Sequence, residues 1–336
     1  MRALLARFPR LRTTLPRVDL GVAETPLEEW VVGGTTLLVK RDDLSAPALG
    51  GNKPRALELL LAGATTGRTL LTVGAAGSTH ALAVAEHGAR LGIRVAVITW
   101  PQEMHDVATA TAHRLASLAA VTPAGSIASA YLRVALRRLS RRVHWIPAGG
   151  SAPLGVLGHV NAALEMSEQL ERLGRAAAET LVVPLGTGGT AAGLLVGLAI
   201  AGLPTRVVGV RVVPAAVANR TRVLRLARRT RALLAGLAGE HLPPVLGSRF
   251  EIEHGAYGGG YGRATPEGRS AAQALRDAGG PPLDLTYSAK AFAVALDRAR
   301  RSPDGRVLFW LTFDGRWLPE LAPQRELSGD LSPRAR

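Results

Sequence analysis

Short runs of β-branched residues alternate with longer segments of helical periodicity along most of the chain. This order is typical of α/β proteins, in which crossover helices join parallel strands. It predicts strands over 36–40, 69–73, 94–99, 143–146, 181–184, 206–213 and 307–312. It also predicts helices over 53–66, 79–91, 103–118, 126–142, 155–174, 189–202, 217–235, 266–278 and 287–301. We therefore expect mostly parallel sheets with helices on both faces, and ligands beyond the carboxyl ends of the strands.

The length and composition are those of a globular protein. With 336 residues, of which 47% are hydrophobic, the chain is long enough for about two domains and a large core. It has no cysteine, so we expect no disulfide framework and a cytoplasmic location. The basic start is interrupted by Arg7, Pro9 and Arg10, which favours an ordinary folded start over a signal peptide. We expect no membrane span and, from the histidine spacing, no metal site.

The net charge of +15 raises the possibility of an anionic partner. Arginines cluster in two predicted helices, Arg133 to Arg142 and Arg220 to Arg231, so a basic nucleic-acid-binding protein is one alternative. Only three of the 41 basic residues are lysines, however, which indicates a general bias towards arginine. Few aromatic residues accompany the clusters, and no nucleic-acid motif is present. Solvated helix faces explain them better, and nucleic-acid binding is disfavoured.

The three lysines are Lys40, Lys53 and Lys290. Lys40 follows a predicted strand beside Arg41, and a solvated or ion-paired charge explains it. Lys53 lies in Gly50-Gly51-Asn52-Lys53-Pro54, where glycines allow close backbone approach and proline suits the first turn of a helix. A partly desolvated lysine at a helix start can form a Schiff base with a carbonyl cofactor. The alternative is a surface lysine after a turn.

A glycine- and threonine-rich loop, Gly186-Thr187-Gly188-Gly189-Thr190, follows a predicted strand and precedes an apolar helix. Its backbone N–H groups, two hydroxyls and the helix dipole favour a phosphate site. The Gly-Lys-Ser/Thr ending of a nucleotide P-loop is absent. A dinucleotide loop is a competing interpretation, but the acidic ribose ligand is missing and Arg211 stands in the next strand. A purely structural tight turn is the other alternative.

A second strand end enters a helix at Gly77-Ser78-Thr79-His80. The hydroxyls of Ser78 and Thr79 and the adjacent amides could bind a carboxylate, and a helix cap explains the same residues. Ser78 does not lie in the nucleophile motif of serine hydrolases.

Two of the four tyrosines are also placed beside predicted helix starts. Tyr261 lies in a glycine-rich loop before Pro266, and Tyr287 opens the helix that contains Lys290. Each phenol could orient or transfer a proton, or could pack as a structural ring.

In this order the motifs resemble the 1-aminocyclopropane-1-carboxylate (ACC) deaminase and D-cysteine desulfhydrase family of pyridoxal-phosphate enzymes. The resemblance runs from Thr25-Pro26-Leu27 to about Arg316 and is most specific at 40–44 and 48–53. It implies fold type II, the fold of the tryptophan synthase beta chain. It also implies that Lys53 binds the cofactor covalently and that residues 186–190 hold its phosphate.

The resemblance assigns the remaining site residues. Cofactor contacts fall to Asn52, Thr79 and, at the pyridine nitrogen, Thr312. Catalytic roles fall to Lys53, Ser78, Tyr261 and Tyr287, and the residues expected to bind substrate are Ser78, Thr79, His80, Tyr261 and Tyr287.

The resemblance also implies a domain organisation. A large cofactor domain would comprise 1–60 and 155–336, and a small inserted α/β domain 61–154, with the cofactor between them. Relatives are homodimers, so a homodimer is expected.

The expected function is that of a pyridoxal-phosphate-dependent lyase or deaminase for a small amino acid. Ser288 stands where the deaminases carry glutamate and the desulfhydrases threonine, which favours α,β-elimination of the D-cysteine desulfhydrase type, giving a 2-oxo acid and ammonia. The alternative is ring opening of ACC to 2-oxobutanoate and ammonia. Thr79 replaces an asparagine, and Phe313-Asp314 replaces a glycine pair. Because of these departures, a further alternative is a protein that binds the cofactor but has altered or lost activity.

Overall fold

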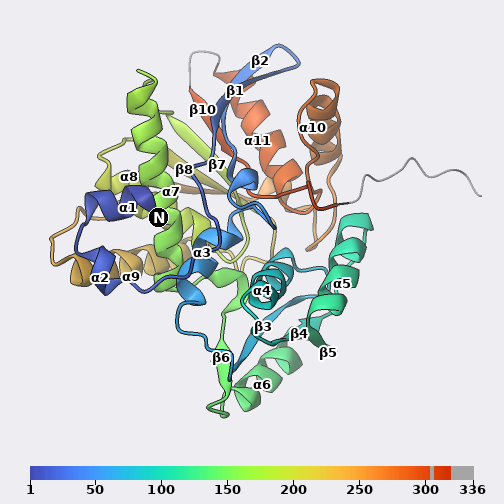
Figure 1. Cartoon of the computed structure of the whole chain (residues 1–336). Helices are drawn as coiled ribbons and strands as arrows, with labels where there is room; N and C mark the ends of the chain where they lie inside the picture. Colours follow the sequence, from blue (N-terminus) through green and yellow to red (C-terminus); the bar gives the residue numbers. More distant parts are fainter. Residues whose placement is uncertain (303–305, 319–336) are drawn as a thin grey trace, which may run out of the picture.

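A computed structural model describes residues 1–302 and 306–318. It confirms the expected α/β class, because two mostly parallel sheets are each covered by helices. In Figure 1 the six-stranded sheet lies in the upper part of the molecule and the four-stranded sheet in the lower part. Each predicted strand and helix has a counterpart at or near its expected position.

The larger sheet has the order β1-β2-β10-β7-β8-β9. Only β1 runs antiparallel to its neighbour, and the other pairs are parallel. Its strands are β1 (Leu27–Val32), β2 (Thr35–Lys40), β7 (Thr180–Leu185), β8 (Arg206–Arg211), β9 (Phe250–Glu253) and β10 (Val307–Trp310).

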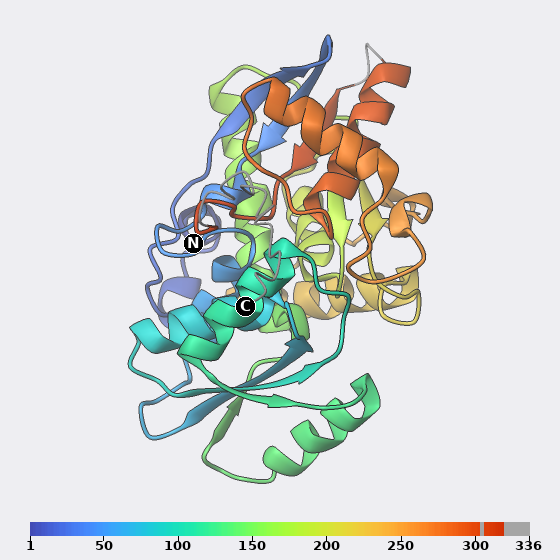
Figure 2. The same ribbon diagram turned by 90° about the vertical axis from the view of Figure 1, so that its right-hand side faces the viewer.

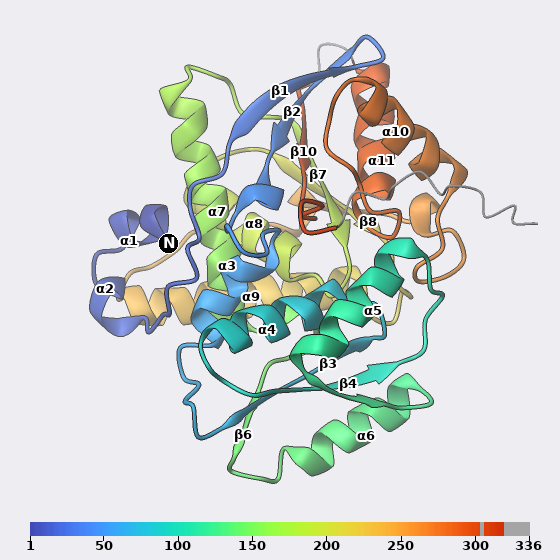
Figure 3. The ribbon, with the colours of Figure 1, turned by 45° about the vertical axis from the view of Figure 1, so that its right-hand side comes forward.

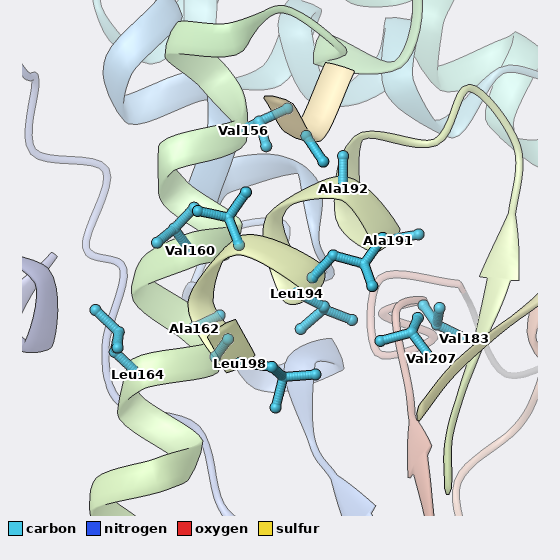
Figure 4. Close-up of a cluster of buried hydrophobic side chains, with 14 of the residues drawn as sticks. Val156, Val160, Ala162, Leu164, Val183, Ala191, Ala192, Leu194, Leu198 and Val207 are labelled. Atoms are coloured by element: carbon cyan, nitrogen blue, oxygen red, sulfur yellow. The ribbon is translucent and has the colours of Figure 1, made fainter. Parts of the chain in front are cut away.

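Both faces of this sheet are buried, which explains its nearly continuous apolar strands. Alternate residues of β10 face opposite sides: Leu308 and Trp310 join the core beneath α7 (Pro153–Arg172) and α8 (Gly189–Ile200). Phe309 joins the core beneath α10 (Pro266–Asp277) and α11 (Ser288–Arg301). Figure 4 shows the first of these cores, where α7 and α8 pack together beside β7 and β8. Gly193 and Gly197 permit this close packing, because an added Cβ would clash with α7.

The smaller sheet is fully parallel, with the order β5-β4-β3-β6. Its strands are β3 (Thr69–Ala75), β4 (Val95–Trp100), β5 (Ala120–Pro123) and β6 (Val143–Trp145). Helices α4 (Thr79–Arg90) and α5 (Asp106–Leu118) cover one face, and α6 (Ile127–Arg137) covers the other. Figures 2 and 3 show this layered arrangement.

The remaining helices attach the chain ends and connections to the larger sheet. They are α1 (Arg2–Arg7), α2 (Leu11–Thr14), α3 (Lys53–Leu60) and α9 (Arg220–Ala238), with 3₁₀ turns η1 (Asp42–Leu44), η2 (Ala148–Gly150), η3 (Gly247–Arg249) and η4 (Gly255–Tyr257). Leu4 and Leu11 are buried in the core beneath α7. No helix in the described part of the chain is both long and apolar enough to span a membrane.

Several expected bounds were wrong. The helix predicted over 126–142 ends at Arg137, because its arginine-rich continuation contributes no buried residue, and the helix predicted over 103–118 begins only at Asp106. The helix expected over 53–66 ends at Leu60, and strands β8 and β10 end earlier than expected. Strands β1, β5 and β9 were not predicted. They are edge strands, whose exposed positions weaken the apolar signal.

The arginines of α9 are not simply a solvated face. Arg220 donates to the carbonyl of Gly247 and Arg231 to that of Leu242, at 2.8 and 2.7 Å. These bonds attach the segment after α9 to the helix, so part of the arginine cluster is structural.

Candidate active site

One cavity of about 480 Å³ lies at the carboxyl ends of strands from both sheets. Its lining includes the ends of β3, β4 and β7 and the segments that follow β8 and β10. Every site residue expected from the sequence lines it: Asn52, Lys53, Ser78, Thr79, His80, Gly186, Thr187, Gly188, Gly189, Thr190, Tyr261, Tyr287 and Thr312. Residues separated by more than 200 positions in the sequence thus meet beyond the carboxyl ends of the strands, which is where α/β sheets bind their ligands.

Lys53 begins α3, with Pro54 in the first turn. The turn before it is held against the segment that follows β10, because Asn52 N donates to the carbonyl of Thr312 at 3.1 Å. Gly51 has φ +83°, and a Cβ there would lie 2.6 Å from the same carbonyl oxygen, so glycine is required. Burial lowers the pKa of Lys53 from 10.5 to about 8, and no charge or hydrogen bond contributes to this shift. The cavity therefore contains a readily deprotonated primary amine.

The other two lysines have different surroundings. Lys40 is completely buried and donates to Glu165 Oε1, Gln169 Oε1 and the carbonyl of Thr25 at 2.6–2.7 Å. The ion-paired alternative for Lys40 was therefore right and the solvated one wrong. Lys290 Nζ donates to the carbonyl of Tyr257 at 2.9 Å. Neither lysine lines the cavity.

Two histidines beside Lys53 stay neutral across the physiological range. Burial and the nearby charge of Lys53 lower the pKa of His80 and of His159 to about 3. His80 Nε2 lies 3.1 Å from Thr72 Oγ1, whose proton is donated to the carbonyl of Ile146. His80 Nε2 must therefore carry the proton in this bond, and β3 orients the ring. No group of three or more metal-ligating side chains occurs among the described residues.

The loop 186–190 opens α8. Gly188, the N-cap, has φ +90°, a conformation that glycine adopts without strain. Thr190 Oγ1 accepts from Asn52 Nδ2 at 2.7 Å, which joins the loop to the residue before Lys53. Thr187 Oγ1 lies 2.6 Å from Ser151 Oγ. The first amides of α8 have no partner within the helix, so they are available to donate to an anion.

Ser78 is the N-cap of α4, and its Oγ accepts from the N–H of Ala81 at 3.3 Å. The capping interpretation is therefore correct for Ser78, while the residue also lines the cavity. Thr79 is the first residue of the helix. The start of α4 thus brings two hydroxyls and amides without helical partners to the cavity, which the start of α8 also lines.

Tyr261 and Tyr287 form a hydrogen-bonded pair, with 2.7 Å between their hydroxyls and their rings at 77°. Burial raises the pKa of Tyr261 to about 12 and that of Tyr287 well above its usual value, so both phenols remain protonated. Asp284 positions Tyr287 by accepting from its backbone N–H at 2.6 Å, and from the N–H groups of Thr286 and Ser288.

The segment after β10 departs from the family pattern and is built into the cavity wall. Phe313 is buried and lines the cavity. Asp314 accepts from Gly50 N at 2.8 Å and is paired with Arg316. The carboxylate therefore holds the turn before Lys53.

Some lining residues were not anticipated from the sequence. Asp284 precedes a helix by a few residues, which is a recognisable capping signal. Trp100 and Tyr131 carry no such signal, since only tertiary packing brings them to the cavity.

Comparison with known proteins agrees with this geometry. Residues 18–312 match the family described as pyridoxal-phosphate dependent enzyme. The nocardicin C-9′ epimerase of Nocardia uniformis is 38% identical over 322 residues, covering 89% of this chain and 92% of the relative. The D-cysteine desulfhydrase of Serratia proteamaculans is 33% identical, covering 91% and 93%. A solved structure of an ACC deaminase homologue superposes with a TM-score of 0.74 at 28% identity, covering 94% and 95%.

The chain is therefore a pyridoxal-phosphate-dependent enzyme, and it has the type II fold of this family. The cavity fits the cofactor on its own features. The amine of Lys53, which makes no hydrogen bond with the described residues, meets the need for a covalent bond to an aldehyde. The start of α8 meets the need for a phosphate site. Both lie on one cavity, joined through the bond between Asn52 and Thr190.

Proposed function

We propose that this enzyme removes the Cα proton and a β-substituent from an amino acid, releasing a 2-oxo acid and ammonia. The observation that carries the proposal is the convergence on one cavity of the Lys53 amine, the phosphate loop and the tyrosine pair. Relatives named D-cysteine desulfhydrase and ACC deaminase support a lyase or deaminase acting on a small amino acid.

The proposal assigns the cofactor's phosphate to loop 186–190 and the substrate carboxylate to the start of α4. Ser78 and Thr79 supply hydroxyls there, and the first N–H groups of the helix supply donors that favour an anion. His80 shapes this end of the cavity as a neutral ring fixed to β3. Because His80 carries no charge, the positive charge at the site comes from Lys53 and from the helix start.

Lys53 would hold the cofactor covalently, and its amine would also serve as the base that takes the Cα proton of the substrate. When bound, pyridoxal phosphate supplies a conjugated ring that withdraws electrons from the substrate Cα. Lys53 Nζ removes the Cα proton, and its lowered pKa keeps part of the amine unprotonated near neutral pH. Thr312, two residues after β10, is assigned to the ring nitrogen.

The tyrosine pair supplies the acid. Tyr287 Oη lines the cavity and shares a hydrogen bond with Tyr261, so it can give a proton to the departing β-substituent and recover one through its partner. The overall elimination consumes water: the β-substituted amino acid yields the protonated leaving group, a 2-oxo acid and ammonium.

Epimerisation is a second candidate. The 38% identity to an epimerase over most of both chains favours it, because inversion at Cα uses the same proton removal. In this case Tyr287 would return a proton to the opposite face of Cα, and the β-substituent would be retained.

The remaining proposals concern organisation. We propose a large domain of 1–60 and 155–336 and a small domain of 61–154, supported by the separate sheets. We also propose a homodimer located in the cytoplasm, on the family resemblance and the cysteine-free sequence. Light scattering of the purified protein measures the oligomeric state.

The proposed function is tested by incubating the holoenzyme with D- and L-amino acids in D₂O. Elimination predicts ammonia and a 2-oxo acid in equal amounts, and epimerisation predicts deuterium at Cα with mixed chirality and no ammonia. Lys53→Ala should abolish both. ACC has no Cα hydrogen, so release of 2-oxobutanoate from it would indicate ring opening. Absence of exchange and of product throughout the panel would contradict the proposal.

A further inference from the structure

Several large apolar side chains line the cavity. Trp100, at the end of β4, stacks on Tyr131 of α6, with ring centroids 6.3 Å apart and ring planes at 24°. Ile127 lies one turn before Tyr131, and Val213 and Val217 follow β8. We call these five residues the apolar wall.

The apolar wall is not fully packed by the protein. The exposed fractions of Ile127 and Tyr131 are 48% and 44%, although both border the cavity that contains Lys53. Large apolar side chains left exposed in a concave site are typical of a ligand surface. The phosphate and carboxylate positions proposed above use the starts of α8 and α4, so the wall is left for another part of the substrate.

The polarity of the cavity limits what that part can be. Apart from Lys53, the charged residues lining it are Asp284 and Asp314 within 1–302 and 306–318. Asp284 accepts from three backbone N–H groups, and Asp314 is paired with Arg316 and Gly50 N. Both carboxylates are therefore engaged in holding the protein.

The polar groups beside the apolar wall are engaged as well. Gln102 accepts from Gly77 N and donates to the carbonyl of Glu103. Arg222 acts electrostatically on Tyr131, but it does not line the cavity and its side chain donates to the carbonyl of Ala216. A charged side chain on the substrate would consequently find no uncommitted charged partner among the described lining residues other than Lys53.

We propose that the apolar wall binds the β-substituent of the substrate and selects amino acids in which it is bulky and apolar, or aromatic. This inference rests on the proposed function and adds the substrate class. For S-benzylcysteine the reaction would break the Cβ–S bond and take up one water. The products would be benzyl mercaptan, pyruvate and ammonium, with no oxidant or reductant. If the enzyme is an epimerase, the same substituent is retained and only Cα is inverted.

The test compares three probes with the holoenzyme: S-benzylcysteine, cysteine and S-carboxymethylcysteine, each as D and L forms. Cα-proton exchange in D₂O and product release give kcat/KM for each probe. We expect S-benzylcysteine to exceed both others by about tenfold or more, since burial of an aromatic ring strengthens binding by at least that factor. Equal values, or preference for cysteine or the carboxymethyl probe, would overturn the inference.

Variants of the apolar wall test which residues cause the preference for S-benzylcysteine. Tyr131→Ala and Ile127→Ala should reduce the ratio of kcat/KM for S-benzylcysteine to that for cysteine. Leu136→Ala is the matched control, because Leu136 lies on the same helix, is 61% exposed and does not line the cavity. An unchanged ratio in the first two variants, with circular dichroism showing that they are folded, would assign the preference elsewhere and overturn the inference.

A binding measurement complements the kinetics. 3-Phenylpropanoate has no amino group to react, and it should inhibit more strongly than propanoate, with the difference reduced in Tyr131→Ala. Equal inhibition by the two acids would contradict a role of the wall in binding. Absence of Cα-proton exchange with every probe would contradict the proposed function itself, which separates the two failures.

Discussion

Tyr261 Oη and Tyr287 Oη are 2.7 Å apart, although the residues lie on a glycine-rich loop and at a helix start. Asp284 holds Tyr287 in place by accepting a hydrogen bond from its backbone N–H. Lys290, one turn along α11, donates to the carbonyl of Tyr257 and so holds the start of the loop that carries Tyr261. The two phenols therefore form one unit that α11 positions.

This pair gives the first prediction. Tyr287→Phe should lower kcat for product formation by about 100-fold, because a positioned acid contributes at least that factor. Tyr261→Phe should lower it less, since Tyr287 keeps its own proton. Visible absorbance of the bound cofactor should persist in both variants. A larger loss in Tyr261→Phe than in Tyr287→Phe would reverse the assignment.

The lowered pKa of Lys53 predicts how fast cofactor-free protein captures pyridoxal phosphate. Only the unprotonated amine attacks an aldehyde, so the rate should rise about tenfold per pH unit and level off above about pH 8. His80 and His159 do not titrate in this range. Stopped-flow absorbance measures the rate. A rise that continues towards the ordinary lysine value of 10.5 would show that Lys53 is not desolvated.

The bond from Asn52 to Thr190 predicts a moderate effect on cofactor affinity. Thr190→Val removes the acceptor that Asn52 Nδ2 uses at 2.7 Å and should weaken binding of pyridoxal phosphate about three- to tenfold. Thr190→Ser retains the hydroxyl and is the control. Equilibrium dialysis gives the affinities. Equal affinities for the valine and serine variants would mean that this bond does not support the phosphate loop.

Stability should depend on the buried charges beneath α3. Glu165 pairs with Lys40 and Arg55, and these two cations hold its pKa at about 2. Glu165→Gln leaves both cations without this counter-charge in the interior. It should lower the free energy of unfolding by about 3 kcal/mol, measured with urea.

The control for this prediction is Glu168→Gln. Glu168 lies on the same helix but pairs with Arg2 at the surface, so its loss should change the stability by less than about 1 kcal/mol. Similar losses in the two variants would contradict a special role of the buried cluster.

Local patterns were sufficient to predict the central strands, the helix starts at Lys53 and Gly189, and the cavity residues that follow strands. The edge strand β1 was not predicted, because part of each of its faces is exposed to solvent and its period-two apolar pattern is therefore weak. Buried polar contacts were not predicted for another reason. The bond between Ser151 and Thr187, and the burial of Lys40 against Glu165, join residues far apart in sequence, and no local signal specifies such pairings.

The central claim is that Lys53 binds the cofactor. The chain has only three lysines, so borohydride reduction of the holoenzyme followed by peptide mass spectrometry tests it directly. The account predicts a pyridoxyl label on Lys53 alone, and none on Lys40 or Lys290, whose amines are committed to hydrogen bonds in the protein. A label on Lys40 or Lys290, or no label at all, would contradict it.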